Sequence, residues 1–170
     1  ALDLGRAVIT DVGSAKGNLV RAARQAFNGM PARFVPGHPI AGSEQSGVTA
    51  ANPKLFRRHK VILTPVAETD PEALALVDRL WRALEADVEH MQVEHHDQVL
   101  AATSHLPHML AYTLVDSLAK RNENLEIFRY AAGGFRDFTR IAGSDPLMWH
   151  DIFLANRDAV LQALDDFRDN

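Results

Sequence analysis

Ala7-Val8-Ile9-Thr10-Asp11-Val12 is a short run rich in β-branched residues, and Gly13-Ser14 follows it directly. Ser14 is a plausible N-cap for a helix after it, because apolar residues then recur at helical spacing at Leu19, Val20, Ala23 and Phe27. A strand, a tight turn and a helix form half of a βαβ unit. We therefore expect a parallel partner strand, and residues 33–38 supply it.

Strands and helices continue to alternate up to about residue 93. A second apolar strand is predicted over residues 60–64. Asp70-Pro71-Glu72 is a strong helix start, because proline suits the first turn and acids favour the positive end of the helix dipole. Polar and apolar residues alternate over residues 87–93, which predicts one more strand. The expected buried stripe of the helix consists of Leu74, Val77, Leu80, Trp81 and Leu84. Residues 1–93 are thus predicted to form an α/β domain around a mostly parallel sheet.

After Val93 the apolar residues follow helical spacing with no strand signal. Pro107 lies inside the first of these stretches and should kink or interrupt it. Further interruptions are expected at Gly133-Gly134 and at residues 143–146, where Asp145-Pro146 is a second strong helix start. The sequence therefore predicts an all-α domain over residues 94–170.

The composition is that of an ordinary globular protein of 170 residues, 46% hydrophobic and 24% charged. The absence of cysteine excludes disulfides, thiolate nucleophiles and zinc–thiolate sites, and it fits a reducing compartment. A net charge of −4 provides no basic field for nucleic acid. No apolar run approaches the roughly 18 residues of a membrane helix. We expect a cytoplasmic protein that binds neither nucleic acid nor membrane.

Two loops at the ends of predicted strands carry candidate functional residues. Ser14 would lie at the carboxyl end of a parallel strand, where open α/β sheets bind ligands, although its loop lacks the spacing of a phosphate-binding P-loop. His38 lies in Pro36-Gly37-His38-Pro39-Ile40-Ala41-Gly42, whose prolines and glycines restrict the backbone around it. An imidazole suits general-base work at neutral pH. The alternatives are a helix cap for Ser14 and, for His38, a turn histidine bonded to a backbone carbonyl.

Histidines are dense between residues 94 and 108, where the sequence contains Glu94, His95, His96, Asp97, His105 and His108. His105 and His108 are three residues apart and can share a helix face, as metal ligands sometimes do. The spacing is not that of His-Glu-x-x-His, however, and no third ligand is dictated. Polar groups that line a pocket or an interface are therefore the favoured interpretation.

Gly133-Gly134 lies in a helical region, where each glycine costs about 1 kcal/mol relative to alanine. Close approach by a ligand or by another helix is the usual compensation. If the following stretch is helical, Asp137 and Arg140 can pair, and Arg140 could clamp a carboxylate through two hydrogen bonds. The alternative is an exposed ion pair of little energetic consequence.

Four motifs follow one another along the chain: Asp11-Val12-Gly13-Ser14-x-Lys16-Gly17, Gly37-His38-Pro39-Ile40-Ala41-Gly42-Ser43-Glu44-x-Ser46-Gly47, Ser104-His105-Leu106-Pro107-His108 and Gly133-Gly134-Phe135-x-Asp137-Phe138-Thr139-Arg140-Ile141-Ala142. In this order they resemble the prephenate dehydrogenase family, which includes arogenate and cyclohexadienyl dehydrogenases. The resemblance runs over nearly the whole chain. It implies the C-terminal part of a Rossmann-type sheet, followed by a helical domain through which family members form homodimers.

The resemblance also implies an oxidative decarboxylation in tyrosine biosynthesis. Hydride passes from the ring carbon that bears the hydroxyl to NAD or NADP, with NAD favoured, while the ring carboxylate leaves as carbon dioxide. Prephenate would give 4-hydroxyphenylpyruvate, and arogenate would give tyrosine. The choice between the two substrates stays open, as does inhibition by tyrosine, which is common in the family.

Roles for individual residues follow from the same resemblance. His38 would accept the hydroxyl proton, and Ser14 would form a hydrogen bond with His38 or with the substrate hydroxyl. Ser14 and Gly13 would both lie beside the nicotinamide of the cofactor. Arg140 would hold a substrate carboxylate. The other residues expected to line or support the substrate pocket are Glu44, His105, His108, Gly133, Asp137 and Trp149.

One part of the family pattern is missing from the sequence. The chain has no Gly-x-Gly-x-x-Gly dinucleotide fingerprint, and it lacks the acidic residue that would select NAD over NADP. We therefore expect a fragment that binds the cofactor poorly and turns over little. Two other functions stay open, a metal-dependent hydrolase that uses the histidine-rich segment and a non-catalytic helical dimerisation module.

Overall fold

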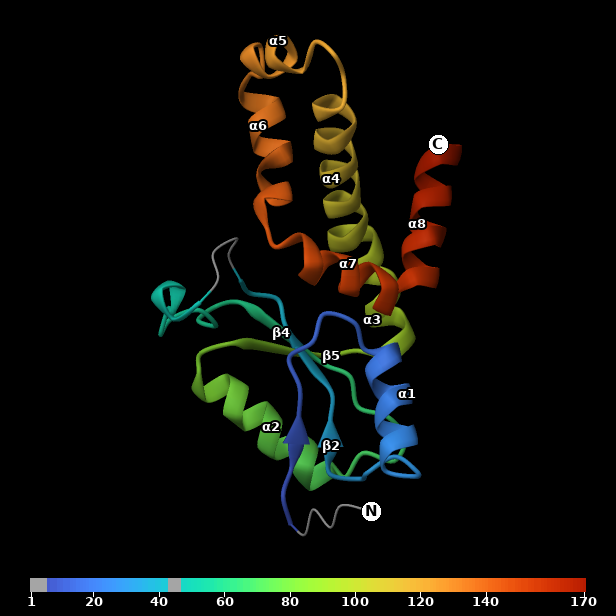
Figure 1. Ribbon diagram of the computed structural model, residues 1–170. Coiled ribbons are helices and arrows are strands. Elements are labelled where there is room, and N and C mark those ends of the chain that lie inside the picture. The colour runs from blue at the N-terminus through green and yellow to red at the C-terminus, as the bar shows by residue number, and fades with distance from the viewer. Residues whose placement is uncertain (1–5, 43–46) are drawn as a thin grey trace. The chain divides into compact units, whose positions relative to one another are not determined.

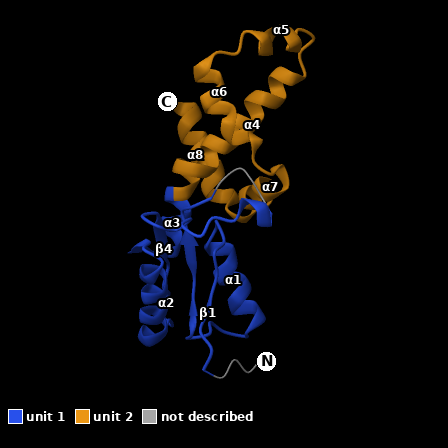
Figure 2. Ribbon diagram, turned by 90° about the vertical axis from the view of Figure 1, so that its left-hand side faces the viewer, with its two compact units in different colours: residues 1–42, 47–99 blue, residues 43–46, 100–170 orange. Residues whose placement is uncertain are grey.

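The computed structural model describes residues 6–42 and 47–170. The chain divides into two compact units, unit 1 with residues 1–42 and 47–99 and unit 2 with residues 43–46 and 100–170 (Figure 2). All strands among the described residues belong to unit 1, whereas unit 2 is helical (Figure 1). The predicted fold class, an α/β part followed by an all-α part, is confirmed. The boundary near residue 94 stays a prediction, and helix α3 (Val93–Leu100) crosses the point where the units divide.

The strands of unit 1 pair in two small sheets. β1 (Ile9–Thr10) pairs in parallel with β2 (Phe34–Val35), as the βαβ pattern predicts. β4 (Lys60–Leu63) lies between an antiparallel partner, β3 (Gly37–Pro39), and a parallel one, β5 (Asp87–His90). Two of the three strand pairings in the described part of the chain are thus parallel, which confirms the mostly parallel sheet.

Two strand boundaries differ from the prediction. The stretch predicted as one strand over residues 33–38 is divided at Pro36, which has no amide hydrogen for a strand ladder and whose carbonyl accepts from the Thr64 amide. The strand predicted over residues 87–93 ends at His90, because α3 begins at Val93. Glu94 in the first turn of α3 favours the helix through its dipole.

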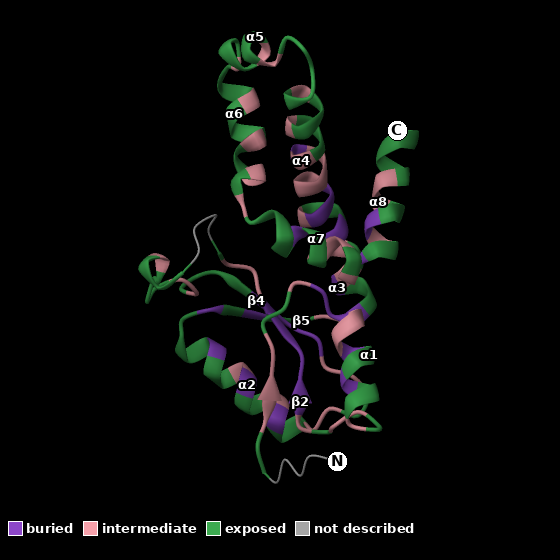
Figure 3. Cartoon of the chain, in the orientation of Figure 1, coloured by how far each residue is buried: buried purple, intermediate pink, exposed green. Residues whose placement is uncertain are grey.

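Helices α1 (Gly17–Ala26) and α2 (Pro71–Ala83) flank the strands of unit 1 on opposite sides (Figures 1 and 2). α2 begins as predicted, with the Asp70 carboxylate accepting from the Glu72 amide at 3.0 Å. Its buried residues pack into the core of the unit (Figure 3), which consists of Val35, Val61, Leu63, Ala73, Val77, Trp81, Ala86 and Val88. Burial of each large apolar side chain contributes about 1.5–3 kcal/mol.

The buried stripe predicted for α2 is only partly correct. Val77 and Trp81 are buried, but Leu80 and Leu84 remain 52% and 46% exposed. Leu80 lies in the last turn of α2 and Leu84 follows its last residue, whereas Trp81 packs in the core and meets the Phe56 ring edge to face at 5.0 Å. A short 3-10 turn, η1 (Val48–Ala50), completes the helical segments of unit 1.

In the helical half, α3 continues through a π-helical turn, η2 (Ala101–His105), into α4 (Leu106–Ala119). The interruption predicted at Pro107 takes this form, because proline has no amide hydrogen to donate to the preceding turn and the wider turn accommodates it. The remaining elements are α5 (Asn124–Arg129), α6 (Gly133–Thr139), η3 (Arg140–Gly143), α7 (Pro146–Ala155) and α8 (Arg157–Asp169).

The start predicted for α7 is confirmed, since the Asp145 carboxylate accepts from the Leu147 amide at 2.8 Å. Within residues 6–42 and 47–170, no helix combines the length and the apolar character that a membrane span requires.

Candidate active site

An ion pair between a fully buried lysine and a partly buried aspartate holds the backbone that leads into His38. The Asp11 carboxylate accepts hydrogen bonds from the amides of Gly37 (2.9 Å) and Gly13 (2.8 Å), and it pairs with the Lys16 ammonium. Lys16 Nζ also donates to the Gly37 carbonyl at 2.7 Å. Asp11 and Lys16 thus satisfy both backbone polar groups of Gly37. We call Asp11, Lys16 and Gly37 the clamp.

Two features of the clamp depend on close packing: position 37 is a glycine, and the Lys16 ammonium is buried. A Cβ on Gly37 would lie 3.1 Å from Leu63 Cδ2 and 3.3 Å from the Asp11 carbonyl, so a larger residue would displace its neighbours. The Lys16 side chain is fully buried. Burial lowers the pKa of Lys16 below its ordinary value, although the Asp11 and Asp97 carboxylates act in the opposite direction.

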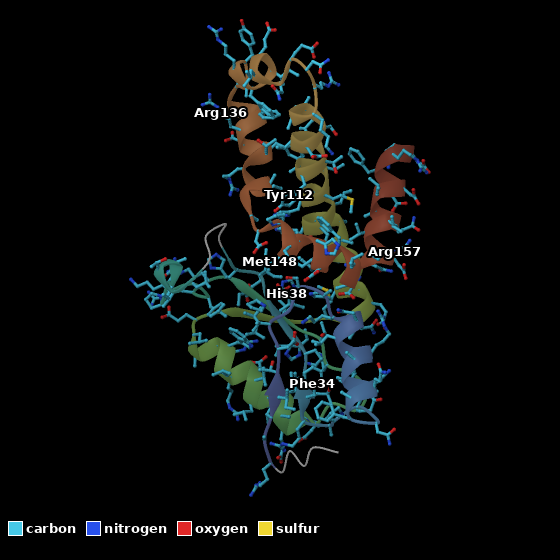
Figure 4. All side chains as sticks on the ribbon, in the orientation of Figure 1. Phe34, His38, Tyr112, Arg136, Met148 and Arg157 are labelled. Atoms are coloured by element: carbon cyan, nitrogen blue, oxygen red, sulfur yellow. The ribbon has the colours of Figure 1, made fainter. Side chains whose placement is uncertain are left out.

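His38, on β3, begins a chain of hydrogen bonds. Its Nδ1 lies 2.9 Å from Nε2 of His96, and the two rings meet edge to face. Nδ1 of His96 lies in turn 2.9 Å from Oδ1 of Asp97. His38 is 9% exposed and His96 is fully buried. Figure 4 shows His38 toward the end of the strands opposite Phe34. We call His38, His96 and Asp97 the relay.

Asp97 connects the relay to the start of α1. Its two carboxylate oxygens accept from the amides of Lys16 and Gly17, each at 2.8 Å. A Cβ on Gly17 would lie 2.9 Å from Asp97 Oδ2, so a larger residue there would displace this carboxylate. Burial alone would raise the pKa of Asp97, but the hydrogen bonds from His96 and the two amides outweigh it and lower that pKa below its ordinary value. Asp97 is therefore an ionised acceptor at neutral pH.

The prediction that Ser14 caps α1 is wrong. The residue before the first helical position is Lys16, whose side chain makes no capping bond. Asp97, 80 residues away from Gly17 in the sequence, meets the free amides of the first turn instead. Ser14 is half-buried in the loop after β1, next to the exposed Gly13. Among the described residues, no hydrogen bond joins Ser14 to His38.

In unit 2, three of the predicted substrate-side residues lie against one another. The His108 ring stacks on the Trp149 indole with centroids 3.5 Å apart, and the His105 ring lies edge-on to the same indole at 6.1 Å. The Asn156 amide nitrogen lies 3.1 Å from Nδ1 of His105. His108 Nδ1 donates to the Ser104 carbonyl at 2.8 Å. We call His105, His108, Trp149 and Asn156 the aromatic cluster.

The aromatic cluster offers a donor for a ligand. Nε1 of Trp149 is buried and has no hydrogen-bond partner in the part of the chain that the structure describes. An unpaired buried donor is costly, and a bound polar molecule would satisfy it. Apolar rings combined with a few directed polar groups are typical of small-molecule sites.

His108 provides a direct test of this environment. Burial lowers the pKa of His108 below its ordinary value of 6.5, while the bond to the Ser104 carbonyl acts in the opposite direction. An NMR titration should therefore place the midpoint of this imidazole below pH 6.5, and a midpoint at or above 6.5 would contradict the assignment. At pH values near this midpoint, His108 therefore binds fewer protons in the folded chain than in the unfolded chain. The free energy of unfolding should accordingly fall as the pH drops through this range, and His108→Gln should remove that component.

The other predicted site residues of unit 2 lie on α6 and η3. Asp137 and Arg140 are both exposed. Nearby, the Tyr112 hydroxyl donates to the Ser144 carbonyl at 2.6 Å, and this bond joins α4 to the segment after η3. Gly133 is the first residue of α6, where the preceding Ala132 is extended. No described atom would come within 4 Å of a Cβ on Gly133 or Gly134, so no other helix among the described residues approaches the glycine pair closely, and approach by a ligand stays a prediction. Glu44 lies outside the described residues.

The histidine-rich segment does not act as one cluster. His96 joins the relay, His105 and His108 join the aromatic cluster, and His95 is exposed. Counting only residues 6–42 and 47–170, no group of three histidine or acidic side chains is placed to hold a metal ion. Sequence reasoning missed the relay and the clamp. Their residues stand in or near the quoted motifs, but no local spacing connects His96 to a residue 58 positions earlier.

The carboxyl ends of β1 and β2 are the edge where an open parallel sheet binds a dinucleotide. Here that edge carries the Ser14 hydroxyl and the clamped loop that leads to His38. These residues suit the nicotinamide end of such a cofactor. The sequence has no Gly-x-Gly-x-x-Gly turn for its pyrophosphate. The residues of this chain therefore fit the nicotinamide end of a dinucleotide, and the sequence contains no motif for its pyrophosphate.

Comparisons with known proteins match almost the entire chain. Residues 4–90 match the family model described as prephenate dehydrogenase, nucleotide-binding domain, and residues 92–170 match that described as prephenate dehydrogenase, dimerization domain. Cyclohexadienyl dehydrogenase of Zymomonas mobilis is 42% identical over 163 residues, and prephenate dehydrogenase of Bacillus subtilis is 45% identical over 164 residues. Each match covers 94% of this chain but only 55% and 43% of the two relatives, so the chain spans about half the length of the curated relatives it matches.

Solved structures agree with these matches. Prephenate dehydrogenase from Aquifex aeolicus, in complex with hydroxyphenyl propionate and NAD+, has a TM-score of 0.87 and 47% identity, covering 96% of this chain and 56% of that chain. Synechocystis arogenate dehydrogenase has a TM-score of 0.78 and 32% identity, covering 96% of this chain and 58% of that chain. Because its two halves match the two family models in order, the chain belongs to the prephenate dehydrogenase family.

Proposed function

We propose that this chain carries the proton-accepting and substrate-binding residues of a dehydrogenase that oxidatively decarboxylates prephenate, arogenate or both, in the synthesis of tyrosine. The observation that supports it most is the buried His38, oriented by His96 and Asp97 in a chain of this family. NAD or NADP, with NAD favoured, accepts the hydride when bound. The relatives named above are prephenate, cyclohexadienyl and arogenate dehydrogenases, which supports this substrate class.

The proposed roles follow from the chemistry of the substrate. The ring carbon that loses hydride carries a hydroxyl, so its proton must leave as the carbon–oxygen double bond forms. His38 accepts that proton. Loss of the ring carboxylate as carbon dioxide then returns an electron pair to the ring, and the proton goes back to the resulting phenolic oxygen. Ser14 and Gly13 lie in the loop where the reacting end of the cofactor would bind.

On the substrate side, we propose that Arg140 holds a carboxylate through two charge-assisted hydrogen bonds. The aromatic cluster would contact the ring and the side chain of the substrate, with Gly133, Asp137 and Glu44 as further members of this site. Exposed apolar side chains in unit 2, among them Leu125 at 86% and Leu147 at 68%, support a homodimer formed through this part. A cytoplasmic location and inhibition by tyrosine belong to the same proposal.

Calorimetric titration of the chain with prephenate, with and without NAD, tests the proposed function. We expect saturable binding of prephenate that Arg140→Ala weakens by about 100-fold, because two hydrogen bonds to a charged group are lost. Arg136→Ala is the matched control, since it removes an exposed guanidinium from α6 and should leave binding unchanged (Figure 4). Equal affinities for wild type and Arg140→Ala would overturn the carboxylate clamp. Absence of binding at millimolar prephenate to both this chain and the full-length protein would overturn the substrate assignment.

A further inference from the structure

The hydrogen-bond donors and acceptors of the relay can be assigned from chemistry alone. A carboxylate only accepts, so the Asp97 oxygen 2.9 Å from Nδ1 of His96 requires a proton on that nitrogen. A neutral His96 then has an unprotonated Nε2, which accepts. Nδ1 of His38, 2.9 Å away, must therefore donate to it. The neutral His38 ring consequently carries its proton on Nδ1 and its basic lone pair on Nε2.

The Asp97 carboxylate, which determines the donors and acceptors of the relay, is itself held in place. Asp97 accepts from the amides of Lys16 and Gly17 at the start of α1, where the positive end of the helix dipole favours an anion. Lys16 also belongs to the clamp that grips Gly37, the residue before His38. The backbone of Lys16 thus anchors the far end of the relay, and its side chain anchors the near end.

We propose that His96 and Asp97 are positioning residues that hold His38 in its Nδ1–H tautomer, so that Nε2 accepts the substrate proton. This inference rests on the proposed function of His38. A protonated His38 would still donate from Nδ1 to His96, so the Asp97 charge also stabilises the imidazolium that forms during turnover. His96 and Asp97 are not proposed to touch the substrate.

The tautomer can be measured without any turnover. Nitrogen-15 chemical shifts of histidine rings distinguish Nδ1–H from Nε2–H, and the chain of 170 residues is small enough for such spectra. We expect His38 to be Nδ1–H in the wild type. Asp97→Asn replaces one of the two carboxylate oxygens by an amide donor. Molecules in which this nitrogen faces Nδ1 of His96 have both rings reversed, so a population of the Nε2–H form of His38 should appear. A wild-type His38 in the Nε2–H form would overturn the proposal, because it would mean that His96 donates from both nitrogens.

Kinetics of the full-length protein supply the second readout. Asp97→Asn should lower kcat by about 100-fold or more, with little change in KM for prephenate, because the wrong tautomer affects proton transfer but not binding. The matched control is Asp78→Asn. It removes another aspartate that contacts a histidine, His90 at 3.0 Å, at a half-buried position outside the relay. This control should leave kcat unchanged.

His96 variants separate positioning from packing. The amide oxygen and nitrogen of glutamine are spaced like the two ring nitrogens, so His96→Gln can accept from His38 and donate to Asp97. His96→Leu fills similar space without either group. We expect His96→Gln to retain at least about 10-fold higher kcat than His96→Leu, with both variants folded by thermal unfolding. Equal kcat in the two variants would mean that His96 only fills space.

The outcomes distinguish this proposal from the proposed function. If His38→Asn abolishes turnover while Asp97→Asn changes neither the His38 tautomer nor kcat, the relay proposal fails and the function of His38 stands. If His38→Asn leaves turnover intact, the function of His38 fails, and the nitrogen-15 spectra still decide whether Asp97 sets its tautomer.

Discussion

His38→Asn should lower kcat for prephenate by about 1,000-fold in the full-length protein while KM changes little, because the lost proton transfer is felt in the transition state. Asparagine places an amide nitrogen near the position of Nδ1, so the contact with Nε2 of His96 can be kept. It has no atom at the position of Nε2. The variant therefore removes the proposed base and preserves the buried hydrogen bond that orients it.

The control for this variant lies on the helix that carries His96. His95→Asn makes the same chemical change at an exposed position of α3 and should leave kcat and KM unchanged. Unaltered kcat in His38→Asn would contradict the dehydrogenase mechanism at this residue and favour the non-catalytic dimerisation module. A parallel rise in KM and fall in kcat/KM, with kcat preserved, would make His38 a substrate ligand only.

Lys16→Met should have the largest effect on stability of any single change considered, about 3–5 kcal/mol of unfolding free energy. The side chain is fully buried, and its removal leaves the mostly buried Asp11 carboxylate without its cation and the Gly37 carbonyl without its donor. Denaturation with urea, followed by circular dichroism, measures the difference directly.

Lys60→Met is the matched comparison for Lys16→Met. Lys60 pairs with Asp87 and Glu89, but its side chain is 54% exposed, so water screens these pairs. We expect its removal to lower the free energy of unfolding far less than that of Lys16. Equal losses for the two lysines would show that burial adds nothing to the Lys16 pair and that the clamp does not stabilise unit 1.

Local signals in the sequence were sufficient to predict the order of elements. The start of α2 at Asp70-Pro71 and that of α7 at Asp145-Pro146 are decided within a single turn, because the capping carboxylate and the first helical amides are neighbours in the chain. The parallel pairing of β1 with β2 follows equally from the strand–helix–strand spacing. The two glycine-flanked segments that lead to Ser14 and His38 were recognisable for the same reason.

Tertiary structure decided what surrounds those residues. Asp97 rather than Ser14 meets the first amides of α1, and His96 meets His38 across 58 positions of sequence. The burial of Lys16, which in the sequence is an ordinary first-turn lysine, likewise depends on its contact with Gly37, 21 positions later. The capping, pairing and strand signals act over a few residues and can be seen in the sequence. Charges and protons are positioned by atoms that only the folded chain brings within 3 Å of one another.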